Sequence, residues 1–463
     1  MAKIVILGAG LTGLSAAYHL EKNKFNNFEI FEKETEVGGL CRSVKQDGFT
    51  FDYTGHLLHI NDSYFGQFID NTINTNNMNN IIRKSFIYSN NTYTKYPFQI
   101  NLKGQSADVI ADCIEEYVKR KPCKKQSKSF YDWVLENFGS GYAKYFFLPF
   151  QTKIFDYDIK KITSSWTGRF VPQTSLREMI IGAIKDTDDQ IGYNSNFYYP
   201  KENGINSWIK NIHKKISKQI KTNFEAEKID LKNKQILFKN GHVENYDYLI
   251  TTMPLDQLLE KLKENSSSNL KNSRKYLVCN SVVNFNLGIN RQDLSPVILS
   301  ESSARVEGHW IYFPEHQFPF YRIGFPHNFS DKMTPKNCSS LYGEFSFVNK
   351  NKNSVKEILN KSIKKAKQLF DISKNEILTE KVIHIKHAYV IYNFWREKNL
   401  TKLLIELKEN DVYSIGRYGE WKYSSMQEAV LDGKSIVDKL LIKPAKTDVK
   451  FQIEKNENII ELN

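Results

Sequence analysis

Two histidines lie three positions apart in the stretch FDYTGHLLHI, which covers residues 51–60. On a helix this spacing would place the imidazoles of His56 and His59 on one face, where both could bind a metal ion. Either histidine could instead act as a general base or lie beside a cofactor. The surrounding residues, and the elements that they form, decide between these three kinds of chemistry.

Metal binding has the least support. The residues before Gly55 alternate in a way that is typical of a strand, so the helical geometry of a histidine pair is not expected. No third ligand cluster accompanies the histidines, and none of the five cysteines forms a C-x-x-C motif. We therefore predict neither a metal site nor a disulfide framework.

Composition and charge are typical of a soluble protein with two or three domains. The chain has 463 residues, of which 40% are hydrophobic and 25% are charged. The net charge of +13 suggests an anionic partner: nucleic acid, acidic lipid or a phosphorylated small molecule. The lysines are scattered, and the densest run, KRKPCKK at 119–125, is typical of a solvated loop. No nucleic-acid partner is therefore predicted.

The sequence also predicts a cytoplasmic protein. It contains no run of 18 apolar residues, so membrane insertion is not expected. The first residues lack the length and the cleavage site of a signal peptide, and the cysteine pattern fits a reducing compartment. The oligomeric state is left open, and a homo-oligomer is compatible with the sequence.

The N-terminal residues predict a dinucleotide-binding fold. A β-branched run, KIVIL at 3–7, is followed at once by GAGLTG at 8–13 and then by residues with helical spacing. Gly8 permits the tight turn, Gly10 lets the backbone approach a pyrophosphate, and Gly13 lets helix and strand pack closely. A second strand ends at Glu32, 19 positions after Gly13, where an acidic side chain would bind ribose hydroxyls.

A second glycine loop indicates which dinucleotide is bound. In EKETEVGGLCRS (32–43), the pair Gly38-Gly39 is followed closely by Arg42. This arrangement resembles the long FAD-binding signature of the glutathione-reductase-like flavoproteins, in the branch of amine oxidases, protoporphyrinogen oxidase, phytoene desaturases and UDP-galactopyranose mutases. The resemblance implies FAD as cofactor, with these binding residues: Gly8, Gly10, Leu11, Thr12, Gly13, Glu32, Lys33, Gly39, Leu40, Arg42, Gly55, His56, Gly416 and Arg417.

Later segments return the chain to the same domain. KNKQILFKNGHVENYDYLITTMPLDQLL predicts a hairpin at Asn240-Gly241 and then a strand, and Gly416-Arg417 stands between a strand and an amphipathic helix. The expected fold class is α/β: a doubly wound, glutathione-reductase-like Rossmann domain with an inserted helical domain and an inserted antiparallel sheet. The expected boundaries are 1–85, 196–265 and 405–445 for the FAD domain, 104–195 for the helices, 86–103 and 270–404 for the sheet, and 446–463 for a tail.

Four more segments narrow the resemblance. KYPFQI (95–100), LPFQTKIF (148–155), WIYFPEHQFPFYRIGFPHNFS (310–330) and GRYGEWKY (416–423) resemble UDP-galactopyranose mutases, especially the eukaryotic-type branch, in order over about residues 1 to 445. The resemblance implies a cytoplasmic isomerase for galactofuranose in cell-surface polysaccharide biosynthesis. It implies interconversion of UDP-galactopyranose and UDP-galactofuranose on reduced FAD, through a covalent flavin N5–sugar intermediate and without net redox. NAD(P)H is the implied reductant.

The same resemblance assigns the remaining site residues. Tyr96 and Gln99 match the uracil contacts, Gly55-His56 matches a turn against the flavin, and His59 is expected to be structural. His56, Arg322 and Tyr423 are the catalytic candidates. The implied substrate-binding residues are Tyr96, Gln99, Gln151, Arg169, Asn194, Tyr312, Arg322, Tyr389 and Tyr423.

Several positions depart from the family pattern. Thr54 replaces the first glycine of a Gly-Gly-His turn, Arg169 stands one place early, and Phe329 replaces a tyrosine. KYSSMQ (422–427) also lacks an expected asparagine. These changes leave the sugar open, with UDP-N-acetylgalactosamine as another substrate. Two alternatives remain: an FAD-dependent oxidoreductase of the amine oxidase, protoporphyrinogen oxidase or desaturase kind, and a flavin-stabilised nucleotide-binding protein without turnover.

Overall fold

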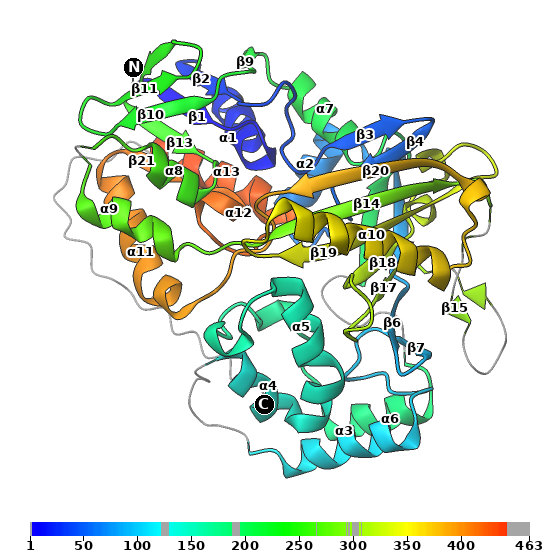
Figure 1. The fold of residues 1–463 in the computed structure, drawn as a ribbon. Coiled ribbons are helices and arrows are strands. Elements are labelled where there is room, and N and C mark those ends of the chain that lie inside the picture. The colour runs from blue at the N-terminus through cyan, green and yellow to red at the C-terminus, as the bar shows by residue number, and fades with distance from the viewer. Residues whose placement is uncertain are drawn as a thin grey trace.

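The computed structural model describes residues 2–121, 129–187, 195–264, 266–292, 294, 297–298, 305–306 and 308–441. Asn194 and the tail 446–463 lie outside these residues. Figure 1 shows three groups of elements: a small sheet with helices that contains the N-terminal residues, a larger sheet beside it, and a group of helices below both.

The first group is built on a parallel sheet of five strands in the order β21-β13-β1-β2-β9. All four residues of β1 are buried, as expected for a strand covered on both faces. Its neighbours come from distant segments, since Ile4 pairs with both Phe28 and Tyr248. The strands are β1 (Ile4–Leu7), β2 (Phe28–Phe31), β9 (Ile220–Lys221), β13 (Tyr248–Thr251) and β21 (Val412–Ser414).

Helices cover this sheet, and a second, antiparallel sheet packs nearby. Helix α1 packs closely on α13, because Gly433 has no Cβ that would collide with the Ala16 amide. The predicted hairpin at Asn240-Gly241 is confirmed as the pair β11 and β12. The elements are α1 (Leu11–Lys22), α2 (Ser63–Thr72), α7 (Asn206–Lys214), α8 (Leu255–Lys261), α9 (Ser268–Ser273), α11 (Phe394–Glu409), α12 (Gly416–Gly419), α13 (Met426–Leu441), β3 (Ser43–Gln46), β4 (Phe49–Asp52), β10 (Ala226–Asp230), β11 (Gln235–Phe238) and β12 (Val243–Asn245).

The larger sheet has seven strands in the order β20-β14-β19-β18-β17-β6-β7. Helix α10 (Lys352–Leu369) covers one face, where Val355, Ile358 and Leu359 pack on Val283 and Phe345. Because side chains alternate along a strand, the neighbouring residues of β14 and β19 face the opposite side, toward the first group. The strands are β6 (Ser85–Ser89), β7 (Thr92–Lys95), β14 (Ser281–Ile289), β17 (Trp310–Tyr312), β18 (Arg322–Gly324), β19 (Ser339–Phe347) and β20 (Ile377–Ile385).

The helices of the third group enclose an aromatic interior. Phe98 stacks on Phe146, and Phe146 stacks on Phe150 in turn. The helices begin at side-chain caps: Ser106 and Ser129 cap α3 and α4, and Ser175 forms a capping box with Glu178 in α6. They are α3 (Ala107–Lys119), α4 (Phe130–Tyr142), a π-helical turn (Ala143–Phe147), α5 (Leu148–Phe155) and α6 (Leu176–Ile184).

The asparagine-rich segment 71–80 contains the end of a helix, a short 3-10 helix and the start of a strand. Helix α2 ends at Thr72, a short 3-10 helix follows, and residues from Met78 onward form a strand. Asparagine is a poor strand former, so pairing with β8 overrides local preference here. The remaining elements are β5 (Met78–Ile82), β8 (Asn196–Pro200), β15 (Val297–Ile298), β16 (Arg305–Val306) and the 3-10 helices Thr75–Asn77, Ile159–Lys161, Gly168–Phe170, Arg274–Tyr276, Pro326–Asn328, Asp331–Met333 and Lys374–Glu376.

Candidate active site

The first glycine turn joins β1 to α1 and packs closely against neighbouring protein atoms. Gly8 has a φ of +101°, which favours glycine. A Cβ on Gly13 would lie 1.9 Å from the Gly8 carbonyl oxygen, so strand and helix can approach this closely only with glycine there. Helix α1 begins at Leu11 after Gly10, and its first amides are suited to an anion.

Glu32 lies at the carboxyl end of β2, beside this turn. Its carboxylate is buried and accepts hydrogen bonds from the amides of Ala9 (2.7 Å) and Glu34 (3.0 Å). Lys33, the next residue, has an exposed side chain whose amine lies 3.6 Å from the Glu34 carboxylate. Through the hydrogen bond from the Ala9 amide, the Glu32 carboxylate links the end of β2 to the first glycine turn.

The second glycine loop and the C-terminal segment complete a cradle of three segments. Gly10 forms a parallel bridge with Gly38, and a Cβ on Gly39 would lie 3.2 Å from the Gly10 Cα. Gly416, with a φ of +80°, approaches Thr12 so closely that a Cβ would lie 2.7 Å from its hydroxyl. We call residues 8–13, 38–39 and 416–417 the glycine cradle. The glycines of the cradle carry no side chains, which fits the pyrophosphate part of FAD, since this part needs close backbone approach.

Two other cofactor candidates of the second loop pack against this region. Arg42 donates from Nε to the Gly39 carbonyl (2.8 Å) and lies over the ring of Tyr53 at 5.0 Å. Leu40 packs against a buried cluster that contains Val282 and Ile383 of the large sheet. The second glycine loop is therefore held by Arg42 within the loop and by the packing of Leu40 on the large sheet.

His56 lies in an irregular turn beyond β4, outside any helix. Thr54 has a φ of +75°, which is strained for a residue with a side chain, and a Cβ on Gly55 would lie 2.9 Å from the Tyr342 hydroxyl. His56 Nδ1 is buried and has no hydrogen-bond partner among the described residues. Burial, then the charges of Arg417 and Arg322, lowers the pKa of His56 to about 4, so the imidazole is neutral at pH 7.

Arg322 forms a bidentate ion pair on the large sheet. It stands directly opposite Glu344 across β18 and β19. Nε donates to one carboxylate oxygen at 3.0 Å, and Nη2 donates to both oxygens at 2.8 and 2.7 Å. Glu344 is fully buried, whereas 17% of the Arg322 side chain is exposed. The guanidinium is thus fixed on one side and open on the other.

Tyrosines surround the two arginines. The Arg417 guanidinium lies 5.8 Å from the ring of Tyr389 and 5.7 Å from that of Tyr423. Burial raises the pKa of the Tyr389 hydroxyl, while Arg322 and Arg417 both lower it, so all three groups lie close together. The Tyr423 hydroxyl is buried without a hydrogen-bond partner among the described residues. We call Arg322, Arg417, Tyr342, Tyr389 and Tyr423 the arginine–tyrosine cluster.

The candidates for base recognition lie next to this cluster. The ring centroids of Tyr96 and Tyr312 are 5.2 Å apart, and Tyr312 also contacts Phe150 at 5.1 Å. Gln99 is buried and donates to the Pro172 carbonyl at 2.8 Å. Gln151 is buried on α5, beside Phe150.

Other predicted residues are not placed in this arrangement. Arg169 lies in the 3-10 helix Gly168–Phe170, but its side chain is outside the described part of the chain, as is Asn194 altogether. His59 Nδ1 donates a hydrogen bond to the Asn196 carbonyl (2.9 Å), and its ring meets Phe197 edge-on at 6.4 Å. Phe329 is buried against Phe197 and Tyr199.

Sequence reasoning missed Tyr342 and Glu344, which both lie on β19. The strand SSLYGEFSF is buried at every position, and a charged residue inside such a strand needs a buried partner. Glu344, the charged residue in this strand, was therefore the feature of the sequence that could have indicated a buried ion pair here. Asp52 and Asn284, which position the His56 turn, carried no comparable signal.

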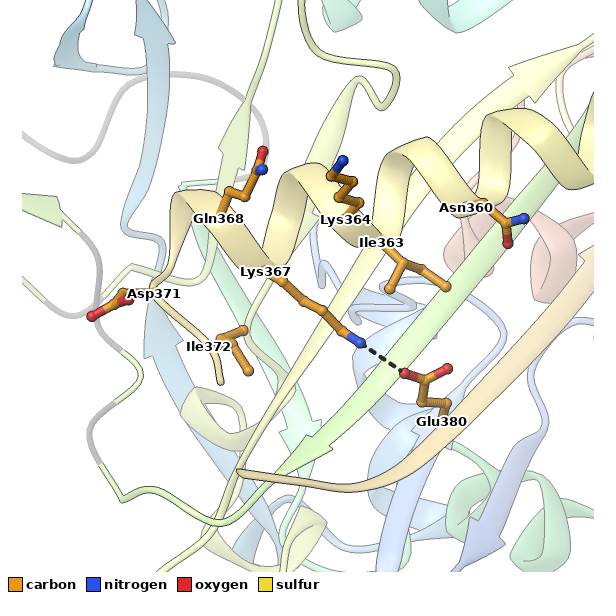
Figure 2. A pocket seen from close by; sticks show the side chains of 8 residues that line it. All are labelled: Asn360, Ile363, Lys364, Lys367, Gln368, Asp371, Ile372 and Glu380. Atoms are coloured by element: carbon orange, nitrogen blue, oxygen red, sulfur yellow. Dashed lines mark hydrogen bonds and ion pairs between the residues drawn. The ribbon is translucent and has the colours of Figure 1, made fainter. Parts of the chain in front are cut away.

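A hollow elsewhere on the surface is not the candidate site. Figure 2 shows it between α10 and β20, with Lys367 paired to Glu380. It lies on the α10 face of the large sheet, opposite the face that carries Arg322 and Glu344. Within the described ranges there is no group of three or more potential metal ligands, and no helix is long and apolar enough to span a bilayer.

Comparisons with known proteins agree first on the nucleotide fold. Residues 6–71 match the family model of the NAD(P)-binding Rossmann-like domain. A 4,4'-diapophytoene desaturase (4,4'-diaponeurosporene-forming) from Staphylococcus aureus (strain bovine RF122 / ET3-1) is 44% identical over 62 residues, which is 13% of this chain and 12% of the desaturase. The matched region thus spans about an eighth of such curated relatives.

A solved structure matches almost the whole chain. A crystal structure of reduced UDP-galactopyranose mutase has a TM-score of 0.87 and 27% sequence identity, and the match covers 95% of this chain and 94% of that chain. The chain belongs with the UDP-galactopyranose mutases among the FAD-binding flavoproteins. An oxidoreductase from Methanosarcina mazei shares the fold alone, with a TM-score of 0.65, 13% identity and coverage of 94% of this chain and 100% of that chain.

These matches confirm the predicted family and the predicted α/β fold class with a Rossmann-like, FAD-binding domain. They also support FAD as the cofactor of this UDP-galactopyranose mutase-like protein. The eukaryotic-type branch stays a prediction.

Proposed function

We propose that the protein interconverts the pyranose and furanose forms of a UDP-sugar, with UDP-galactopyranose and UDP-galactofuranose as the first pair to test. The main support is the arginine–tyrosine cluster next to the glycine cradle, in a chain that matches a reduced UDP-galactopyranose mutase over 95% of its length. Paired guanidinium groups with tyrosine hydroxyls suit a diphosphate.

FAD is held, in this proposal, by the glycine cradle, by Glu32 at the ribose and by the loop of Leu40 and Arg42. When bound and reduced, FAD supplies the nucleophilic centre of the reaction. NAD(P)H is the proposed reductant, and the cytoplasm is the proposed compartment. We also propose the boundaries 1–85, 196–265 and 405–445 for the FAD domain, 104–195 for the helical domain, and 86–103 and 270–404 for the sheet domain. The cluster then takes Arg417 and Tyr423 from the FAD domain, and its other members from the sheet domain.

The protein's own side chains bind and orient the substrate. Arg322 and Arg417 neutralise the diphosphate, and the hydroxyls of Tyr389 and Tyr423 donate to its oxygens. Tyr96 and Gln99 bind the uracil. A neutral imidazole can donate or accept a hydrogen bond, so the buried Nδ1 of His56 would hold one to the cofactor edge.

The second candidate is an oxidoreductase of the amine oxidase, protoporphyrinogen oxidase or desaturase kind. The desaturase match supports it only through the first part of the chain, which any flavoprotein of this branch would share. An apolar substrate would leave the open side of the Arg322 guanidinium without an anionic ligand. The mutase is therefore the better supported function.

The decisive experiment uses the FAD-loaded protein reduced with dithionite. UDP-galactopyranose and UDP-galactofuranose are added separately, and the products are separated by chromatography. Each sugar nucleotide should convert to the other, and the oxidised protein should convert neither. Arg322→Lys should lower the rate by about a hundredfold, because a point charge cannot replace a bidentate fork.

Arg291→Lys is the matched control, since Arg291 pairs with Glu376 away from the cluster and should keep the native rate. Flavin reduction by an amine, without sugar interconversion, would favour the oxidoreductase. If neither reaction occurs but UDP perturbs the flavin absorbance, the protein is a nucleotide-binding flavoprotein without turnover. Using UDP-N-acetylgalactosamine in parallel tests the sugar.

A further inference from the structure

Glu344 is a buried carboxylate to which the proposed function gives no role. It lies in the middle of β19, opposite Arg322 on one neighbouring strand and Asn284 on the other. Its exposed fraction is 0%, so it is shielded from water by the sheet and the first group of elements. A charge in this position is tolerated only when it is paired and hydrogen-bonded.

The pairing occupies one edge of the guanidinium. Nε and Nη2 of Arg322 make three hydrogen bonds to Glu344, while Nη1 makes none within the described residues. The ring of Tyr342 lies 5.9 Å from the guanidinium carbon. The planar fork is therefore held in one orientation, with Nη1 as the donor left for a ligand.

The pairing also sets the charge of the cluster. Arg322 and Glu344 together are neutral, His56 is neutral at pH 7, and Arg417 adds one positive charge. Without Glu344, two uncompensated guanidinium groups would lie close to Tyr389. The carboxylate therefore fixes both the direction of Arg322 and the number of charges that a ligand meets.

We propose that Glu344 is a positioning residue for the nucleotide diphosphate: it orients Arg322 so that Nη1 faces the anion. This inference rests on the proposed function, because it takes the ligand of Arg322 to be a diphosphate. It predicts that Glu344 acts on binding of the nucleotide through Arg322, and that FAD binding does not depend on it.

UDP titration of the oxidised FAD-loaded protein, followed by flavin absorbance, tests the proposal. Glu344→Gln keeps the shape, but its amide nitrogen faces the donors of Arg322 and breaks the fork. The dissociation constant for UDP should rise about tenfold, with unchanged FAD content, and Glu344→Asp should recover part of the affinity. Glu380→Gln is the matched control, because Glu380 pairs with Lys367 on the α10 face, and it should bind UDP as the native protein does.

A double variant separates positioning from a general structural role. Arg322→Lys with Glu344→Gln should bind UDP no more weakly, within about twofold, than Arg322→Lys alone, because the glutamate acts through the arginine. The KM for the sugar nucleotide should rise in Glu344→Gln, while kcat at saturation should change much less. A structural defect would instead lower FAD content and kcat together.

Native UDP affinity in a folded Glu344→Gln variant overturns the proposal, and so do additive losses in the double variant. If Glu344→Gln does not fold, native affinity in Glu344→Asp overturns it equally. A native protein that binds UDP, depends on Glu344 for it and fails to interconvert the sugars refutes the proposed function alone. A native protein that does not bind UDP refutes both.

Discussion

At the scale of single residues, the turn at His56 is held in place by hydrogen bonds to the nearby Asp52. Asp52 accepts hydrogen bonds from the hydroxyls of Ser43 and Tyr199, both at 2.6 Å, and its carbonyl accepts one from Asn284 at 3.1 Å. These contacts join β3, β8 and β14 two residues before the strained Thr54. The hydrogen bonds of Asp52 therefore hold the backbone beside Thr54, the residue that departs from the family pattern.

Replacing His56 by Ala should leave FAD bound and slow both flavin reduction and sugar interconversion, by about a hundredfold, because the turn loses its polar contact with the cofactor. FAD content by absorbance and single-turnover rates measure the two effects. His59→Ala is the control, since His59 packs on Asn196 and Phe197, and its rates should be native. A native rate in His56→Ala would remove His56 from the site.

Residues of the candidate site were predictable only where a motif or a family pattern named them. The arginine, the tyrosines and the glycines stand in such patterns, and the structure brings Arg322, Tyr389 and Tyr423 together. Glu344 and Tyr342 were not named, because their roles depend on the register of β18 on β19, which no single segment encodes.

At the scale of elements, glycines set how closely helices and strands approach. Gly13→Ala should force α1 away from β1, because the new methyl group would lie 1.9 Å from the Gly8 carbonyl oxygen. The variant should lose most of its FAD and about 1–3 kcal/mol of stability, as expected for overpacking. The ratio of FAD to protein and the free energy of unfolding measure this.

Gly66→Ala is the matched control for that variant. It lies inside α2, where a Cβ would be 3.4 Å from Ile60, so native FAD content and unchanged or slightly higher stability are expected. Full FAD content in Gly13→Ala would contradict the predicted packing role. The elements of the nucleotide fold were predictable because each has a local pattern, whereas the strand at 78–82 was not, since its partner β8 is distant in sequence.

At the scale of the whole molecule, histidines in separate regions respond to acid together. Burial is the main reason why the pKa values of His19, His56 and His309 are lowered to about 4. Between pH 6.5 and 4 the unfolded chain takes up protons that the native protein does not, so stability falls as the pH falls. Asp52 and Asp432, with pKa values raised to about 6 by burial, oppose this loss below pH 6.

Because three histidines outweigh two aspartates, the free energy of unfolding should fall by about 2–4 kcal/mol between pH 7 and pH 5. Urea unfolding at both pH values measures it. His19→Gln should reduce the loss, whereas His213→Gln, at an exposed position of α7, should not. Equal stability at both pH values would contradict the predicted excess of the histidine effect over the aspartate effect.

The strand order of the nucleotide fold has a consequence for how the chain folds. β1 pairs with β13, and β13 pairs with β21, so the sheet joins residues 4–7 to 248–251 and 412–414. Such high contact order delays folding until distant segments have been synthesised. During translation β1 can pair with β2 early, but its other neighbour, β13, emerges much later, and β21 adds to that side of the sheet later still. Capture of the flavin is then a late step, and the first 71 residues, which carry the most recognisable motif, cannot complete it alone.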